Sequence, residues 1–335
     1  MTGGSAAVMD RRQFVVTLIG GLTGVPAHAA GQPAARVVRV GVLRNAPDNT
    51  VFRQNFGEFR RALHEIGLVE GEGLVIEYRV RAGTAEEIGA LAGELSRLQM
   101  TAIVAIGPAS VRAAAHATRA IPIVAVDLES DPIAEKFVTG LARPGGNVTG
   151  LFLDFPELSG KWIELLREIA PRLSRITVAW DPSTPPNLLR GAEVAARTLR
   201  VDLSSVETPG SEGLAAAFRI AAGTRGGAML VLPSPVINSA RRQIVAMAAK
   251  HRVPTIMAFP EFAEEGGLIA YGPNVPAMFR QAGDVMAKVL RGTSPAEIPI
   301  ERPARFELVV NRKTAAALAL TVPRSLLARA DRVIE

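Results

Sequence analysis

The sequence contains no cysteine, and this absence excludes several kinds of site. Disulfides, thiolate-bound metals, iron–sulfur clusters, cysteine nucleophiles and a lipid-anchored N-terminal cysteine all require that residue. The four histidines are too few and too scattered for a histidine-rich metal site. Aromatic residues make up only 5% of the chain, so its core must consist mainly of Ala, Val, Leu and Ile. We therefore expect neither a metal ion nor another cofactor.

Concentrated charge is also lacking. The chain has 38 Lys and Arg residues against 32 Asp and Glu residues, for a net charge of +6. No run of five or six basic residues occurs, and basic residues do not alternate with aromatic ones. A surface that binds nucleic acid would need such a cluster. We therefore predict that the protein binds no nucleic acid.

Length and hydrophobicity are sufficient for two domains. A chain of 335 residues suits two domains of roughly 150 residues each. Hydrophobic residues make up 48% of the chain and charged residues 21%, which favours a packed core over disorder.

The N-terminal segment has the pattern of an export signal. Arg11 and Arg12 form a short positive region, and residues 14–25 form an apolar run that is too short to span a bilayer. Ala27 and Ala29 then match the small-residue pattern of a signal-peptidase site. Because no cysteine is present for lipid attachment, we expect a free periplasmic protein.

We assign residues 1–29 to this signal peptide. The paired arginines resemble a twin-arginine signal, whereas Asp10 before them and Val16 after them depart from that pattern. The general secretory route and the twin-arginine route therefore both stay open. Met9 directly precedes the charged region, so residues 1–8 would be an extension from an upstream start codon.

The rest of the chain alternates between strand and helix patterns. Apolar runs predict strands over residues 37–43, 74–78, 102–106, 121–128, 148–153, 176–180, 202–206, 228–232, 255–258 and 268–271. Helical spacing predicts helices over residues 52–66, 84–98, 110–117, 156–169, 186–199, 211–222, 237–251 and 276–290. Strands that are apolar throughout suit a parallel sheet covered on both faces. The pattern predicts an α/β fold with two doubly wound, Rossmann-like lobes.

The candidate ligand-binding residues follow from this fold. Ligands of doubly wound sheets bind beyond the carboxyl ends of the strands, and two facing lobes place those ends across a cleft. The polar and aromatic candidates at these ends are Arg44, Asn45, Ser110, Asp127, Asp154, Asp181, Asn187, Ser234, Phe259 and Tyr271. Gly107, Trp180 and Glu261 also stand at such ends. These side chains form no catalytic set, so we predict no catalytic residue.

Seven segments resemble one protein family when taken in order. They are residues 67–71 (GLVEG), 76–78 (IEY), 143–150 (RPGGNVTG), 161–166 (KWIELL), 266–273 (GGLIAYGP), 306–311 (FELVVN) and 325–331 (SLLARAD). Together with the N-terminal signal, they resemble the substrate-binding proteins of ABC transporters of the tryptophan/tyrosine-type (TrpX-like) family. The resemblance covers nearly the whole chain.

The resemblance implies the type 1 periplasmic binding protein fold, in which three crossover strands join two lobes and a hinge closes on the ligand. On that fold we assign residues 36–147 and 272–304 to the N-terminal lobe, and residues 148–271 and 305–335 to the C-terminal lobe. It further implies a small-molecule ligand, such as an amino acid or aromatic compound, and an ABC permease in the inner membrane as partner. We expect the protein to be a monomer.

An amino acid would need a partner for its carboxylate and another for its ammonium group. Ser110 begins a helix after a strand, which makes it either an anion site or an ordinary helix cap. Arg44 either pairs with a carboxylate through its planar fork or lies at the rim. Asp127 or Asp154 is the candidate for the ammonium group, whereas Asp181 precedes a proline and is also explained by a turn.

The aromatic candidates have alternative roles as well. Phe259 and Trp180 either stack on a ligand ring or extend the core. Tyr271 either lines the cleft or packs in the hinge.

No motif predicts an enzyme. The chain lacks a P-loop, a G-x-G-x-x-G segment after the first strand, a G-x-S-x-G elbow and an H-E-x-x-H zinc motif. Three functions stay open: a transport receptor, which we favour, a sensory subunit that reports its ligand to a membrane signalling protein, and an exported enzyme on the same fold.

Overall fold

The computed structural model describes Met1 and residues 37–153, 155–182, 184 and 186–335, and residues 37–335 form one compact unit. The predicted signal peptide, residues 1–29, lies outside the described residues apart from Met1. Within the described part of the chain, no helix is long and apolar enough to cross a bilayer.

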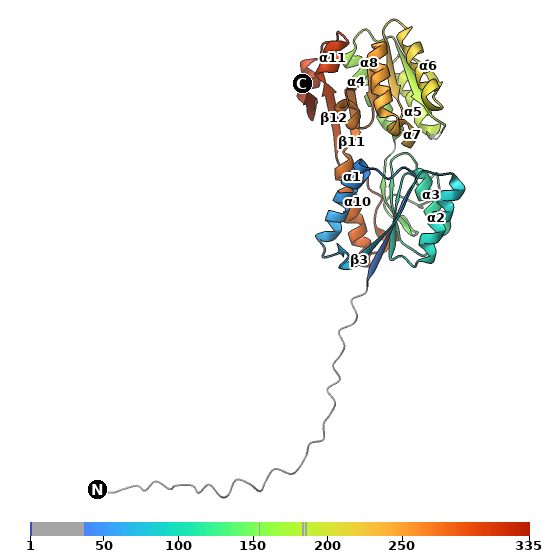
Figure 1. Ribbon diagram of the computed structural model, residues 1–335, viewed down its shortest axis with the longest axis vertical. Helices are drawn as coiled ribbons and strands as arrows, with labels where there is room; N and C mark the ends of the chain where they lie inside the picture. The colour runs from blue at the N-terminus through green and yellow to red at the C-terminus, as the bar shows by residue number, and fades with distance from the viewer. Residues whose placement is uncertain (2–36, 154, 183, 185) are drawn as a thin grey trace. The chain divides into compact units, whose positions relative to one another are not determined.

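The first sheet has six parallel strands in the order β2-β3-β1-β4-β5-β6. Its strands are β1 (Val38–Arg44), β2 (Val69–Glu70), β3 (Gly73–Val80), β4 (Ala102–Ile106), β5 (Ile123–Asp127) and β6 (Val148–Phe152). Its helices are α1 (Thr50–His64), α2 (Ala85–Arg97), α3 (Pro108–Ala117) and α10 (Val275–Leu290). Helices α1 and α10 pack together over one face, and α2 and α3 pack together over the other (Figure 1). The sheet is therefore covered on both sides, as its apolar strands require.

The second sheet has seven strands in the order β13-β12-β11-β10-β9-β7-β8. Its strands are β7 (Arg175–Trp180), β8 (Asp202–Glu207), β9 (Gly227–Val231), β10 (Thr255–Met257), β11 (Ile269–Pro273), β12 (Phe306–Asn311) and β13 (Arg332–Ile334). Only the pairing of β11 with β12 is antiparallel among the described strands of this sheet.

Helices also cover both faces of the second sheet. Helices α4 and α5 pack over one face, and α6 and α8 pack over the other. The helices that follow the first sheet are α4 (Phe155–Ile169), α5 (Pro186–Thr198), α6 (Gly210–Ala222), α7 (Pro235–Ser239), α8 (Arg241–His251), α9 (Glu261–Glu264), η1 (Pro295–Glu297), α11 (Arg312–Ala317) and α12 (Arg324–Arg329).

The chain passes three times between the two sheets. It leaves the first sheet after β6, returns after β11 to form α10, and leaves again between Glu301, which bridges to β6, and β12. The predicted α/β fold with two doubly wound sheets is confirmed. The predicted start of the C-terminal lobe at residue 148 is wrong for β6, because this strand pairs in parallel with β5 and extends the first sheet. The other lobe limits stay a prediction.

Gly272 in β11 permits a close approach of the backbone just after β10. A Cβ atom at this position would lie 1.9 Å from the carbonyl oxygen of Ala258. We expect Gly272→Ala to lower the free energy of unfolding by about 1–3 kcal/mol, because the backbone must move to relieve the overlap. The measurement is a urea titration.

Gly89→Ala is the matched control for this prediction. Gly89 is exposed in α2, and nothing lies within 4 Å of an added Cβ atom. There the same substitution should raise stability by roughly 0.5–1 kcal/mol, because alanine is the better helix former. Equal stability of Gly272→Ala and the wild type would contradict the close contact.

Candidate functional site

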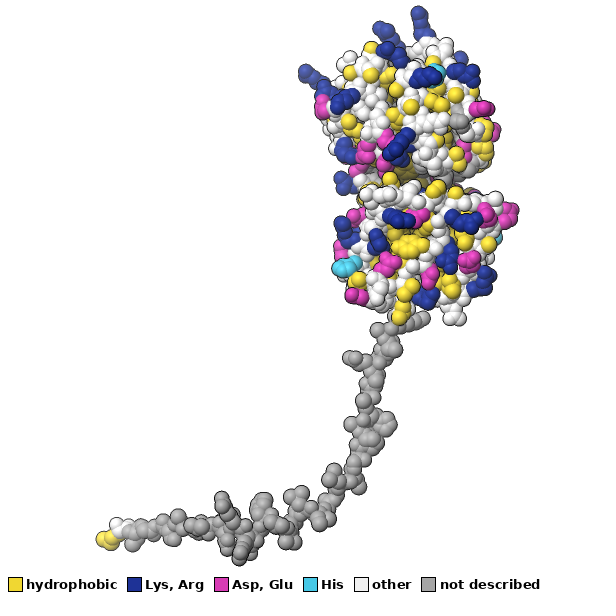
Figure 2. Space-filling model, in the orientation of Figure 1, with side chains coloured by type: hydrophobic (Ala, Val, Ile, Leu, Met, Phe, Trp, Pro, Cys, Tyr) yellow, Lys and Arg dark blue, Asp and Glu magenta, His cyan; other side chains and the backbone are white. Residues whose placement is uncertain are grey.

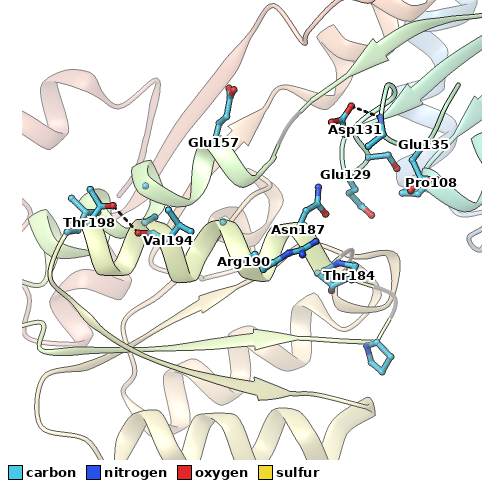
Figure 3. A pocket seen from close by; sticks show the side chains of 18 of the residues that line it. Pro108, Glu129, Asp131, Glu135, Glu157, Thr184, Asn187, Arg190, Val194 and Thr198 are labelled. Carbon is cyan, nitrogen blue, oxygen red and sulfur yellow. Dashed lines mark hydrogen bonds between the residues drawn. The ribbon is translucent and has the colours of Figure 1, made fainter. Parts of the chain in front are cut away.

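A cavity of about 1030 Å³ has walls from both halves of the fold (Figure 3). The first half contributes Pro108, Arg112, Glu129, Ser130, Asp131, Ala134 and Glu135. The second half contributes Glu157, Gly160, Glu164, Pro182, Thr184, Pro186, Asn187, Arg190, Gly191, Val194, Ala195, Thr198 and Leu199. Its volume is at the upper end of the range typical of small-molecule sites.

Several charged groups on the walls already have ion-pair partners. The pairs are Arg112 with Glu135 at 3.0 Å, Arg302 with Glu157 at 2.7 Å, and Lys161 with Glu164 at 3.4 Å. Among the described residues, three lining groups make no ion pair: Glu129, Asp131 and Arg190. The cavity therefore offers unpaired acids from the first half and an unpaired base from the second.

Asp127 orders the loop that carries these acids. It ends β5 and is fully buried, and its Oδ1 accepts hydrogen bonds from the backbone N–H groups of Glu129 at 3.0 Å and Ser130 at 3.1 Å. Its Oδ2 is also buried and has no hydrogen-bond partner among the described residues. Burial raises the pKa of the Asp127 carboxyl, although the two N–H groups act in the opposite direction.

Glu129 has the most perturbed carboxyl on the cavity wall. Burial, followed by the negative charges of Asp127 and Asp181, raises its pKa from 4.5 to about 8. Asp181 directly follows β7 of the second sheet, whereas Asp127 and Glu129 belong to the first. Carboxyl groups from the two sheets are thus close enough to interact.

Asp181 itself is held within the edge of the second sheet. It is buried, its Oδ2 accepts a hydrogen bond from the Ser234 hydroxyl, and its N–H donates to Thr184 Oγ1 at 3.3 Å. The Ser234 Oγ in turn accepts from the N–H of Ile237 at 3.1 Å and caps α7. These bonds join the loops that follow β7 and β9.

Three predicted residues of the first sheet form local contacts. Ser110 Oγ accepts a hydrogen bond from the N–H of Asn45 at 2.9 Å, and Asn45 Oδ1 accepts one from the N–H of Gly83 at 3.0 Å. The Arg44 guanidinium lies 4.4 Å from the Phe52 ring centroid and donates to the Pro47 carbonyl at 2.7 Å. Burial lowers the pKa of Arg44.

The predicted aromatic residues contact the core. Tyr271 stacks on Phe306 with ring centroids 6.0 Å apart, and its carbonyl accepts the Trp162 Nε1–H at 2.7 Å. Phe259 and Trp180 are partly buried and pack against the largest hydrophobic cluster.

Of the ten predicted ligand-binding residues, Asn187 lines the cavity and Asp154 lies outside the described residues. The other eight are not among the lining residues, and their role in binding stays a prediction. Glu129 and Arg190 line the cavity but were not predicted. The strand-end rule was a usable signal for Glu129, which stands two residues after Asp127, whereas Arg190 lies inside a helix and has no such signal.

Two doubly wound sheets, three passages between them and a solute-sized cavity with walls from both define a type 1 periplasmic binding protein fold. The family model described as ABC transporter substrate binding protein matches residues 40–334, and the chain belongs to this family. It is therefore a solute-binding component of an ABC transporter that captures a small molecule.

Individual relatives agree with this assignment. A tyrosine-binding protein of Clostridioides difficile (strain R20291) is 24% identical over 265 residues, which cover 78% of this chain and 75% of the relative. Two solved structures each align over 89% of this chain and 99% of their own length. One is a conserved domain protein from Vibrio cholerae with a TM-score of 0.80 and 24% identity. The other is an ABC domain from Streptococcus pneumoniae in complex with L-Trp, with a TM-score of 0.79 and 22% identity.

Proposed function

We propose that this protein captures an amino acid in the cavity between its sheets and delivers it unchanged to an ABC permease. The observation that carries the proposal is a pair of ionisable side chains without ion-pair partners among the described residues, Glu129 on the wall from the first half and Arg190 on the wall from the second. An amino acid is a zwitterion: its carboxylate complements the Arg190 guanidinium, and its ammonium group complements the carboxylate that Glu129 forms on losing its proton. The names of two relatives, one tyrosine-binding and one in complex with L-Trp, support the same ligand class.

Helix α5 supplies groups for the rest of such a ligand. Arg190 and Asn187 project from it into the cavity, and a guanidinium matches a carboxylate through its planar fork (Figure 3). Val194, Ala195 and Leu199 add apolar surface to the same wall. We infer that this wall receives the carboxylate and the apolar part of the ligand.

Closure provides the mechanism of capture and release. A solute that contacts both halves binds the closed form better than the open form, so it shifts the population towards closure. We infer that the mature protein is a free periplasmic monomer and that its partner is a permease in the inner membrane.

On the face shown in Figure 2, acidic and basic side chains are interspersed.

A thermal-shift screen tests the ligand class. The purified protein is heated with each of the twenty amino acids, and with purines, sugars and small organic acids as comparison sets. At about 100 times its dissociation constant, a bound amino acid should add about 2.7 kcal/mol of stability. Stabilisation by a compound from a comparison set and by no amino acid would overturn the proposal.

A further inference from the structure

Three carboxyl groups from the ends of strands in the two sheets are close enough to interact electrostatically. Asp127 and Glu129 come from the end of β5, and Asp181 comes from the end of β7. Asp181 accepts hydrogen bonds from hydroxyl groups, whereas Asp127 Oδ2 is buried without a partner among the described residues. Of the three, Glu129 is the one that lines the cavity.

Among the described residues, none of the charged groups near Glu129 forms an ion pair with its carboxyl. Arg112 on α3 already pairs with Glu135, and the Asp131 carboxylate accepts the backbone N–H groups of its own turn. Arg190 stands on α5 in the opposite half of the cavity wall. Two or three negative charges in a partly dehydrated space repel one another, so this part of the cavity favours a proton or a cation.

We propose that Glu129 selects solutes that carry a positively charged nitrogen and receives this nitrogen at the meeting point of the two sheets. The inference rests on the proposed function, because it assigns the ammonium group of the amino acid to one residue. A metal ion is a poorer occupant, since the described residues contain no group of three His, Asp or Glu side chains arranged to hold one.

Proton release is a direct consequence of this assignment. Because the pKa of the Glu129 carboxyl is about 8, this group is protonated in most molecules of the ligand-free protein at pH 7. A neighbouring ammonium group stabilises the carboxylate and lowers that pKa. The carboxylic acid then gives up its proton to solvent and forms an ion pair with the ammonium group, so binding releases up to one proton.

Paired probes test the selectivity. The affinities of L-tyrosine and L-tryptophan are compared with those of their deaminated analogues, 3-(4-hydroxyphenyl)propanoate and 3-(indol-3-yl)propanoate, by isothermal titration calorimetry at pH 7. Titrations in phosphate and in Tris, which differ in ionisation enthalpy, count the protons released. The variants are Glu129→Gln and, as a matched control, Glu261→Gln.

Glu261 suits this control because burial also raises the pKa of its carboxyl, but it does not line the cavity. We expect the wild type and Glu261→Gln to prefer the amino acids over the analogues by at least about a hundredfold and to release a proton. In Glu129→Gln the preference should shrink by at least about tenfold, and proton release should disappear.

The outcomes separate the two proposals. If the amino acids bind Glu129→Gln as tightly as the wild type, the Glu129 assignment is wrong and the proposed function stands. Equal affinity of the wild type for an amino acid and its deaminated analogue also overturns the assignment. If the wild type binds none of the four compounds, the Glu129 assignment fails, and the amino acid proposal is then decided by the thermal-shift screen.

Discussion

Replacing Trp162 by alanine is expected to lower the free energy of unfolding by about 3–5 kcal/mol. Trp162 is the largest fully buried side chain among the described residues, with 0% of its surface exposed. It lies in α4, just after the first passage between the sheets, and its Nε1–H donates to the Tyr271 carbonyl at 2.7 Å. Because Tyr271 is in β11, just before the second passage, one indole ring connects both crossings.

Two further variants make this prediction specific. Trp162→Phe keeps most of the apolar surface but removes the N–H donor, so we expect a smaller loss, about 1–3 kcal/mol, from the buried carbonyl that loses its partner. Ile220→Ala in α6 removes a side chain that is 45% exposed and should change stability by less than about 0.5 kcal/mol. Chemical denaturation measures all three. Wild-type stability of Trp162→Ala would refute the anchoring role.

The general fold was predictable because apolar strands and amphipathic helices alternate regularly. The capping box of α2 is a local example: Thr84 and Glu87 form both of its hydrogen bonds, as their spacing predicts. Sheet membership was less predictable. The apolar residues of β6 suit either sheet, and only the pairing with β5 assigns the strand to the first. An apolar run predicts burial but does not specify the neighbouring strand.

The location of the site was easier to predict than its residues. The cavity does lie beyond strand ends, as the doubly wound fold requires. Ser110 and Ser234, however, use their hydroxyl groups to accept backbone N–H groups. Which polar group bonds within the protein and which lines the cavity depends on how loops from distant parts of the chain pack, and no local pattern contains that information. Arg190 illustrates this point, because its helix position resembles any other exposed site.

Glu129→Gln should stabilise the ligand-free protein at alkaline pH and have little effect in acid. The folded protein raises the pKa of Glu129 from 4.5 to about 8. Below pH 4.5 the carboxyl is protonated in both the folded and the unfolded state, and its ionisation then costs the folded state no stability. Between pH 4.5 and about 8 the unfolded state loses the proton first, so the stability of the wild type falls as pH rises.

Glutamine does not ionise, so the stability of the Glu129→Gln variant does not fall in this pH range. Each pKa unit corresponds to about 1.4 kcal/mol. At pH 9 the free energy of unfolding of Glu129→Gln should therefore exceed that of the wild type by on the order of 3–5 kcal/mol, and near pH 4 the two should be equal. Urea titrations at several pH values measure the free energy of unfolding of both proteins.

Glu265→Gln provides a control of opposite sign. Its hydrogen bond with Arg241 lowers the pKa of the Glu265 carboxyl, so this group adds stability above its ordinary pKa and loses that contribution as pH falls. The Glu265 variant should therefore be less stable than the wild type at neutral pH and approach it in acid. A Glu129→Gln curve that runs parallel to the wild type across the whole range would mean that Glu129 ionises normally, and that no repulsion between the two sheets exists for a cationic solute to relieve.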